Sequence, residues 1–194
     1  SQIVARVLPS KCREEVKVLL QEVYGYEDFR NLEGYDDLFK GKEKLQLSQG
    51  QLIEEVIMEA EKGIKGDSSA HNLLLTAPTG AGKSLLFQLP AIYLGNEYTL
   101  LTLVVSPLKA LIVDQVEALR ELGYERVAYA SSDLSPEQKN EVYRRVREGD
   151  VDLFYLSPEL LLAYDISYFV GERRIGVVVV DEAHTVTTWG KEFR

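Results

Sequence analysis

Residues 77–84, Ala-Pro-Thr-Gly-Ala-Gly-Lys-Ser, have the types and spacing of a loop that binds phosphate groups. The glycines let backbone N–H groups close around phosphate oxygens, and the amino end of a following helix adds a favourable dipole. In this arrangement Lys83 reaches the β- and γ-phosphates, and the Ser84 hydroxyl is a ligand of Mg²⁺. The alternative is a glycine-rich turn with a capping serine, since Ala77 stands where the strict pattern has a glycine. The residues predicted to surround the phosphates are Thr79, Gly80, Ala81, Gly82, Lys83 and Ser84.

Two adjacent carboxylates, Asp181 and Glu182, follow the apolar run 177–180. At the tip of a buried strand Asp181 can hold Mg²⁺ through water, and Glu182 can polarise an attacking water molecule. Phosphoryl transfer needs few groups beyond these, because the protein mainly positions the reactants and stabilises charge. Taken alone, an acidic pair after a strand is the start of a solvated loop. Beside a phosphate loop, it predicts hydrolysis of a nucleoside triphosphate.

Alternating strands and helices must position these two motifs. From Asn72 onwards, short apolar runs alternate with helical segments, and the runs are apolar at nearly every position, which is typical of strands buried on both faces. The pattern predicts an α/β fold with a mostly parallel sheet that binds ligands at the carboxyl edge of its strands. The predicted strands are 73–76, 100–105, 127–130, 153–156 and 177–180, and the predicted helices are about 84–93, 107–122, 136–148 and 158–164.

Three Ser-Pro pairs predict where helices begin, because serine caps a helix and proline fits its first turn. The pairs are Ser106-Pro107, Ser135-Pro136 and Ser157-Pro158. Gln138 adds a capping box to the second pair. The first and third pairs directly follow predicted strands, so these helix starts are expected at the carboxyl edge of the sheet.

The first 45 residues follow a different pattern. Apolar residues at i, i+3, i+4 and i+7 from Val16 predict one amphipathic helix. A stretch rich in Tyr, Asp and Gly, with weak periodicity, follows over residues 25–41. A second helix is predicted over about 48–62, and a loop over 66–69.

The composition excludes several classes of protein. One cysteine and two histidines rule out an internal disulfide framework and disfavour a structural zinc site. No apolar run approaches the ~20 residues that a membrane helix needs, and no signal peptide opens the chain, so an intracellular soluble protein is expected. The formal net charge is −9, so bulk attraction cannot hold nucleic acid, and any such role depends on locally placed donors.

The motifs together resemble those of superfamily 2 helicases, with Asp-Glu-Ala-His at 181–184 and Ala-x-Thr-Gly-x-Gly-Lys-Ser at 77–84. In that superfamily an alanine commonly replaces the first glycine of the loop. The segments similar to motifs of the RecQ-type DNA helicases are 84–91, 104–111, 114–116, 153–161 and 189–194. The resemblance covers about residues 47–194. It implies a RecA-like P-loop domain that uses ATP and Mg²⁺, with His184 coupling hydrolysis to movement.

The resemblance also implies how adenine is bound. Tyr26 and Arg30 match an aromatic residue and an arginine that embrace the base. In the family, the glutamine that recognises adenine follows the arginine within a few residues, where this chain has Glu33. Gln51 matches the context of that glutamine better, which implies an insertion between Arg30 and Gln51. The alternative is that Tyr26 and Arg30 merely pack a surface turn.

In the resembling family, the motifs at Ser106 and Ser157 grip the backbone of single-stranded DNA. Backbone N–H groups and hydroxyls at helix starts can position phosphates without net positive charge. Aromatic residues such as Trp189 and Phe193 can stack on bases, a contact worth about 1–3 kcal/mol per base. The predicted nucleic-acid contacts are Ser106, Pro107, Ser157, Trp189 and Phe193. The alternatives are plain helix capping for the serines, which is compatible with binding, and a partly buried loop anchor for Trp189.

We therefore expect an N-terminal helical extension with an inserted loop over residues 1–45, and a first RecA-like motor domain over 46–194. The resemblance implies an ATP-dependent DNA helicase whose second RecA-like domain, expected beyond Arg194, supplies an arginine finger. Such a protein is expected in the cytoplasm at the nucleoid of a prokaryote, or in the nucleus of a eukaryote. The alternative hypotheses are a superfamily 2 RNA helicase, a DNA translocase that does not unwind, and an ATP-switched interaction module.

Overall fold

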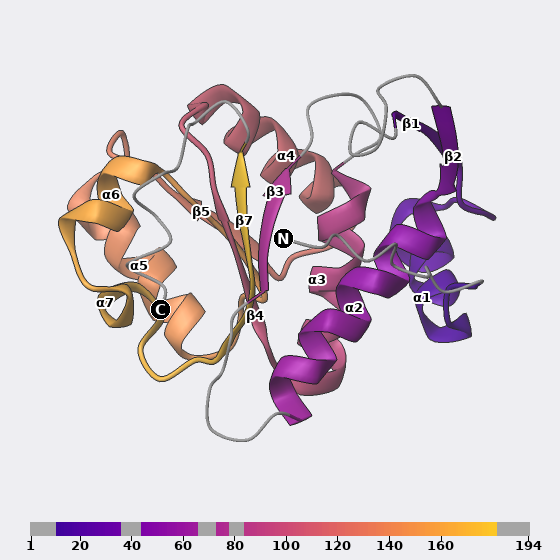
Figure 1. Cartoon of the computed structure of the whole chain (residues 1–194). Coiled ribbons are helices and arrows are strands. Elements are labelled where there is room, and N and C mark those ends of the chain that lie inside the picture. Colours follow the sequence, from indigo (N-terminus) through magenta and orange to yellow (C-terminus); the bar gives the residue numbers. More distant parts are fainter. Residues whose placement is uncertain (1–10, 36–43, 66–72, 78–83, 182–194) are drawn as a thin grey trace.

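A five-stranded sheet forms the centre of the protein. The computed structural model describes residues 11–35, 44–65, 73–77 and 84–181. The strands follow the order β3-β7-β4-β6-β5, and every neighbouring pair is parallel (Figure 1). Their bounds are β3 (Leu73–Ala77), β4 (Leu101–Val105), β5 (Val127–Ala130), β6 (Leu153–Leu156) and β7 (Ile175–Asp181). The predicted α/β fold is confirmed, and each predicted strand is present within two residues of its expected ends.

Helices connect the strands and cover the sheet. Their bounds are α1 (Glu14–Leu19), α2 (Gln49–Lys65), α3 (Leu85–Tyr98), α4 (Lys109–Glu121), α5 (Pro136–Arg147), α6 (Pro158–Ala163) and α7 (Ile166–Val170). A π-helical turn, η1 (Leu20–Tyr24), continues α1. The short helix α7 lies in a segment for which no element was predicted. Among the described residues, no helix combines the length and the apolar character needed to cross a membrane.

The sheet separates two apolar layers, because successive side chains of a strand point to opposite faces. Val104, Tyr155 and Val179 pack in one cluster with side chains of α1, α2, α3 and α4. Their neighbours Leu103 and Phe154 pack in a second cluster with side chains of α5, α6 and α7. Figure 1 shows the same division, with α2 and α3 on one side of the sheet and α5, α6 and α7 on the other. The protein therefore has three layers, and the central strands β4 and β6 are buried on both faces.

The three predicted helix starts differ in the structure. Ser135 forms the predicted capping box, because its hydroxyl accepts from the Gln138 N–H and its own N–H donates to the Gln138 side chain. Ser157 occupies the N-cap position of α6, but its hydroxyl makes no capping hydrogen bond. The prediction for Ser106 is wrong, because α4 begins at Lys109 and its N-cap residue is Leu108. The Ser106 hydroxyl instead accepts from the Leu108 N–H at 3.2 Å and closes a tight turn.

A β-hairpin lies where the sequence indicated a loop. Strands β1 (Asn31–Tyr35) and β2 (Lys44–Ser48) pair antiparallel, in a register that runs from Asn31 opposite Ser48 to Tyr35 opposite Lys44. Leu45 and Leu47 have the two-residue period of a strand, but β1 contains Asn, Glu and Gly, which are poor strand formers. The hairpin leads directly into α2, which begins at Gln49.

The amino-terminal helix shares the core of the α/β layer. Cys12, Val16 and Leu20 belong to the same apolar cluster as Ile53 and Ile57 of α2. This packing joins residues 12–20 to the helix that leads into the sheet. A division of the chain at residues 45 and 46 stays a prediction.

Arg13 fastens this first helix to α2 and α3. Its guanidinium donates to Glu54 at 2.9 Å and to Glu61 at 2.7 Å, and also to the Tyr93 hydroxyl at 3.0 Å. The Tyr98 hydroxyl donates to Glu61 as well. The hydrogen bond from Arg13 lowers the pKa of Glu61, and the hydrogen bond to Glu61 raises the pKa of Tyr98 to about 12. One cation thus holds two carboxylates that lie about two turns apart on α2.

A second set of ion pairs, around Asp152, connects loops at the amino edge of the sheet. Asp152, directly before β6, is 2% exposed and accepts from Arg126 at 2.7 Å and from Arg173 at 3.1 Å. Arg126 precedes β5 and Arg173 lies shortly before β7. Arg173 also donates to the backbone oxygens of Val146, Val151 and Thr99. These contacts join the loops that enter β4, β5, β6 and β7 at one edge.

Candidate functional site

The two motifs with catalytic residue types emerge side by side from the carboxyl edge of the sheet. Ala77 at the end of β3 lies opposite Asp181 at the end of β7, on neighbouring parallel strands. The phosphate loop follows Ala77, and the acidic motif begins at Asp181. Neighbouring strands are ~4.8 Å apart, so one phosphate–metal group can contact both motifs. The predicted site residues that lie outside the described part of the chain are Thr79, Gly80, Ala81, Gly82, Lys83, Glu182, His184, Trp189 and Phe193.

Ser84 marks the start of the helix that follows the phosphate loop. Its φ and ψ of −61° and −30° are helical, and its carbonyl accepts from the N–H groups of Phe87 and Gln88. Helix α3 then runs for 14 residues. The predicted phosphate loop therefore stands in the sequence between the end of β3 and the start of α3, which is the context that such a loop requires. The hydroxyl of Ser84 and the carboxylate of Asp181 are the hard oxygen donors that Mg²⁺ prefers.

Ser106 and Ser157 lie next to each other along the same edge. They follow Val105 and Leu156, which are register partners on β4 and β6, and the Ser106 N–H donates to the Leu156 oxygen at 3.3 Å. Both serines are buried. The Ser157 hydroxyl has no hydrogen-bond partner among the described residues. The strand order therefore places the ends of β3, β7, β4 and β6 next to one another in that order, and Ser106 and Ser157 directly follow the last two.

Tyr26 and Arg30, predicted to embrace adenine, contact each other. The Tyr26 ring is 48% exposed and stacks on Tyr24, with ring centroids 6.1 Å apart and planes 15° apart. The Arg30 guanidinium carbon lies 5.9 Å from the centre of the Tyr26 ring. An exposed aromatic face beside an arginine is chemically suited to stacking on a base.

The first turn of α2 brings Gln51 to the same region. The Gln51 Oε1 accepts from the Ser48 N–H at 3.2 Å, while the Ser48 hydroxyl accepts from the Gly50 N–H at 3.1 Å. This reciprocal pattern caps the start of α2, so Gln51 has a structural role there. A carbonyl oxygen has two lone pairs and the amide two N–H groups, so one such bond leaves capacity to contact a base.

Gln49 is a residue of this region that the sequence did not single out. It is buried, and it exchanges two hydrogen bonds with the backbone of Arg30: its N–H donates at 2.8 Å and its Oε1 accepts at 2.9 Å. A Cβ at Gly50 would lie 2.7 Å from Phe29 Cδ2, so the Phe29 ring packs on bare backbone. These contacts hold the Arg30 segment against the start of α2. Gln49 and Gln51 both stand in Ser-Gln-Gly-Gln, and no periodicity distinguishes the buried Gln49 from the half-buried Gln51.

The single cysteine is not placed to act as a nucleophile. Burial, with a further contribution from the nearby Glu54 carboxylate, raises the pKa of the Cys12 thiol to about 12. The Cys12 Sγ lies 3.9 Å from Glu54 Oε2. The thiol therefore stays protonated at physiological pH and packs as a small apolar side chain.

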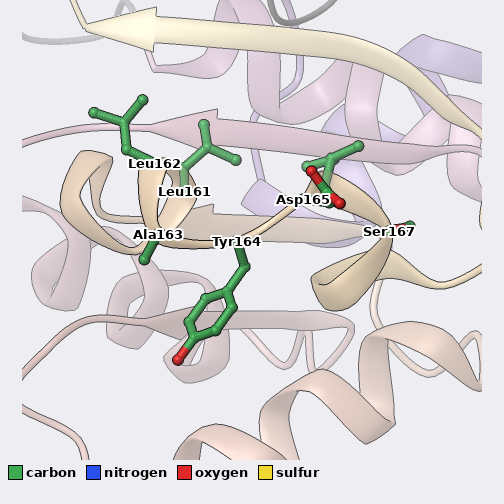
Figure 2. Close-up of a pocket in the computed structure, with 7 residues that line it drawn as sticks. Leu161, Leu162, Ala163, Tyr164, Asp165 and Ser167 are labelled. Carbon is green, nitrogen blue, oxygen red and sulfur yellow. The ribbon is translucent and has the colours of Figure 1, made fainter.

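A hollow of about 820 Å³ lies beside the connection between α6 and α7 (Figure 2). It is lined by Leu161, Leu162, Ala163, Tyr164, Asp165, Ile166 and Ser167. Figure 2 shows Tyr164 and Asp165 pointing to different sides of this connection, and the hollow contains none of the predicted site residues. Among the described residues, no group of three or more His, Cys, Asp or Glu side chains could hold a metal ion.

Comparison with known proteins agrees with the motifs. The family model for DEAD/DEAH box helicases matches residues 49–194. ATP-dependent DNA helicase Q-like 5 of Arabidopsis thaliana is 37% identical over 93% of this chain and 16% of its own length. ATP-dependent DNA helicase RecQ of Bacillus subtilis (strain 168) is 32% identical over 91% of this chain and 24% of its own length. A solved structure of the DUF1998 helicase MrfA bound to DNA aligns with 80% of this chain and 18% of its own, at 21% identity and a TM-score of 0.43.

The chain thus spans less than a quarter of the length of these two curated relatives. The family model, by contrast, covers the parallel sheet from β3 to β7, the phosphate loop and the acidic motif. It begins at Gln49, the first residue of α2. The chain therefore belongs to the DEAD/DEAH box helicase family.

Proposed function

We propose that this chain is the first RecA-like motor domain of an ATP-dependent DNA helicase of the RecQ type, which couples ATP hydrolysis to movement along DNA and to its unwinding. The observation that supports the proposal is the register of Ala77 with Asp181, the two residues from which the phosphate loop and the acidic motif continue in the sequence. The similarity to the Arabidopsis and Bacillus DNA helicases supports DNA as the substrate. The proposed location is wherever the chromosome lies, in the cytoplasm of a prokaryote or the nucleus of a eukaryote.

In the proposed ATP site, the residues divide the work between holding charge and activating water. The loop N–H groups and Lys83 hold the phosphates, while Ser84 and Asp181 hold Mg²⁺, Asp181 through water. Mg²⁺, when bound, neutralises charge on the β- and γ-phosphates. Glu182 orients and polarises the attacking water. A second RecA-like domain of the same protein would complete the site with an arginine finger. Such an arginine stabilises the charge that develops in the transition state of nucleoside triphosphate hydrolysis.

On the nucleic-acid side, an acidic chain must use local donors. Ser106, Pro107 and Ser157 lie at the carboxyl edge beside the proposed ATP site, which supports a role for them in positioning the DNA backbone. Lys109 supplies a cation near Ser106, although it is paired with Asp133 at 2.8 Å. The proposal also includes stacking on bases by Trp189 and Phe193 and coupling by His184, and for these three residues it rests on the sequence alone.

The test measures ATP hydrolysis and strand separation by the full-length protein that contains this chain. We expect single-stranded DNA to stimulate ATP hydrolysis, a forked DNA duplex to be unwound, and Lys83→Ala to abolish both activities. Unwinding of RNA duplexes in preference to DNA would support an RNA helicase instead. Hydrolysis without strand separation would support a translocase, and tight ATP binding without turnover would support a switch.

Gln51→Ala in the full-length protein is expected to weaken ATP binding by roughly ten- to a hundredfold and to narrow the preference for ATP over GTP. An amide can donate to the ring nitrogen N7 and accept from the 6-amino group of adenine, whereas guanine offers no proton there. A wrong base leaves the polar group unpaired, which costs about 1–3 kcal/mol. The measurement is competition against a fluorescent ATP analogue.

Two control variants separate base recognition from structure. Ser48→Ala removes the other half of the cap of α2 and should lower stability slightly without changing the preference for ATP over GTP. Glu33→Ala should do little, because that residue lies in strand β1 of the inserted hairpin. A larger effect from Glu33→Ala than from Gln51→Ala would show that the alignment of this region is wrong.

A further inference from the structure

A chain of three hydrogen bonds crosses the interior between four elements of the protein. The Tyr24 hydroxyl of η1 donates to Gln88 Oε1 of α3 at 3.0 Å. The Gln88 Nε2 donates to the Tyr155 hydroxyl of β6 at 3.0 Å. The Tyr155 hydroxyl in turn donates to Gln115 Oε1 of α4 at 2.7 Å. These side chains come from four separate parts of the sequence, up to 131 positions apart.

The chain of hydrogen bonds is buried, and it has one direction. Gln88 is 5% exposed and Tyr155 is 1% exposed. Burial raises the pKa of both Tyr24 and Tyr155 well above the usual value, so both hydroxyls stay protonated at physiological pH. Each tyrosine has one proton to donate, and Tyr155 uses its proton for Gln115. Its oxygen therefore accepts from Gln88, and reversing one bond would require reversing the others.

Each of the four hydrogen-bonded side chains lies next to, or on, an element of the proposed ligand sites. Tyr24 stacks on Tyr26, which is proposed to cover adenine. The Gln88 N–H donates at 3.0 Å to the carbonyl of Ser84, which begins the helix after the phosphate loop. Tyr155 stands two residues before Ser157, and Gln115 lies on α4, the helix that follows Ser106. The hydrogen bonds thus connect the proposed base and phosphate contacts with both proposed nucleic-acid contacts.

We infer that Gln88 and Tyr155 are positioning residues that couple nucleotide binding to nucleic-acid binding, an inference that rests on the proposed function. A displacement of the first turns of α3 moves Gln88 relative to Tyr155. Leaving a buried hydroxyl without a hydrogen-bond partner costs free energy, and the close-packed interior leaves no room for the side chains to move apart. The end of β6 and the middle of α4, where Gln115 lies, therefore shift with α3 rather than independently of it.

The test compares the affinity of the full-length protein for a labelled oligothymidylate with and without a non-hydrolysable Mg-ATP analogue. For the wild type we expect a change of roughly 5- to 150-fold, with the same factor when the analogue is titrated with and without DNA. Tyr155→Phe keeps the ring and removes only the hydroxyl. It is expected to leave each separate affinity within about threefold and to bring the coupling factor close to one.

Two further variants make the result specific. Tyr124→Phe is the matched control, because the Tyr124 hydroxyl is also buried and has no hydrogen-bond partner among the described residues. It packs against the same apolar cluster as Tyr155 and should keep the wild-type coupling factor. Gln115→Leu removes the acceptor at the far end of the hydrogen bonds, on the half-buried face of α4, and should reduce coupling with little risk to folding.

The outcomes distinguish this inference from the proposed function. A wild-type coupling factor in both Tyr155→Phe and Gln115→Leu would overturn the inference and leave these hydrogen bonds a structural role only. Binding of both ligands by the wild type without mutual influence would overturn it too, while the proposed sites would stand. A wild type that binds neither ligand would overturn the proposed function and the inference together.

Discussion

The 194-residue chain on its own is expected to hydrolyse ATP about 10³–10⁵ times more slowly than the full-length protein that we propose contains it. The phosphate loop and the acidic motif begin on neighbouring strands, so the chain should still bind Mg-ATP, though weakly. The arginine finger proposed for a second RecA-like domain accounts for the difference in rate, because it stabilises charge only in the transition state. The measurement is phosphate release at saturating Mg-ATP and single-stranded DNA, with both proteins at equal concentration.

A turnover of about 1 s⁻¹ by the chain alone, abolished by Lys83→Ala, would contradict this expectation. The Lys83→Ala control is essential, because a trace of a contaminating ATPase would survive the substitution. Glu182→Gln adds a second control in the full-length protein. It should keep ATP binding while lowering the rate of hydrolysis by at least about a hundredfold, since an amide cannot polarise the attacking water as a carboxylate does.

Arg13→Met is expected to lower the free energy of unfolding by about 3 kcal/mol. The substitution keeps an unbranched apolar side chain but leaves Glu54 and Glu61, whose side chains are 10% and 13% exposed, without their cation. Breaking a buried ion pair costs about 3–5 kcal/mol, and the lower end applies because Arg13 itself is 22% exposed and partly solvated. Urea unfolding monitored by circular dichroism measures the change.

Arg144→Met is the matched control for this prediction. Arg144 also contacts two glutamates, Glu141 and Glu148, but on the exposed surface of α5, so its removal should change stability little. The hydrogen bond from Arg13 lowers the pKa of Glu61 from its ordinary 4.5 in the folded protein. The ion pair therefore stabilises the fold fully above that pH, and this stabilisation is lost as the pH falls through the lowered pKa. The difference between wild type and Arg13→Met should therefore narrow in acid. Equal losses in both variants at neutral pH would show that burial does not distinguish the two arginines.

The sequence predicts the central strands well because they are buried on both faces. Runs such as 101–105 and 153–156 are fully buried in the structure, and only a continuous apolar segment satisfies that environment. The capping box at Ser135 was also predictable, since all its bonds lie within four residues. The hairpin β1–β2 was not, because Asn31–Tyr35 gains its strand conformation from pairing with β2 rather than from its own propensity.

Within the candidate site, too, the features with a local sequence pattern were predictable, and those that depend on distant partners were not. The phosphate loop and the acidic motif carry local patterns, and their adjacency follows from the parallel order of β3 and β7. Ser106 was assigned to a helix cap because Ser-Pro fits one, yet its hydroxyl bonds Leu108 and the helix begins later. The partnership of Gln88 with Tyr155 spans 67 positions, and no spacing rule connects residues that far apart.

The ion pairs of Asp152 with Arg126 and Arg173 have a consequence for how the protein can change during evolution. They join the loops that enter four strands at the amino edge, and Gly95 approaches them so closely that a Cβ there would lie 2.6 Å from the Asp152 side chain. All the proposed ligand contacts on the sheet lie at the opposite edge. Substitutions that retune nucleotide or nucleic-acid preference therefore leave the ion pairs of Asp152 in place. We expect natural variants of this chain to keep Gly95, Asp152 and Arg173 together, including variants that differ in nucleotide or nucleic-acid preference.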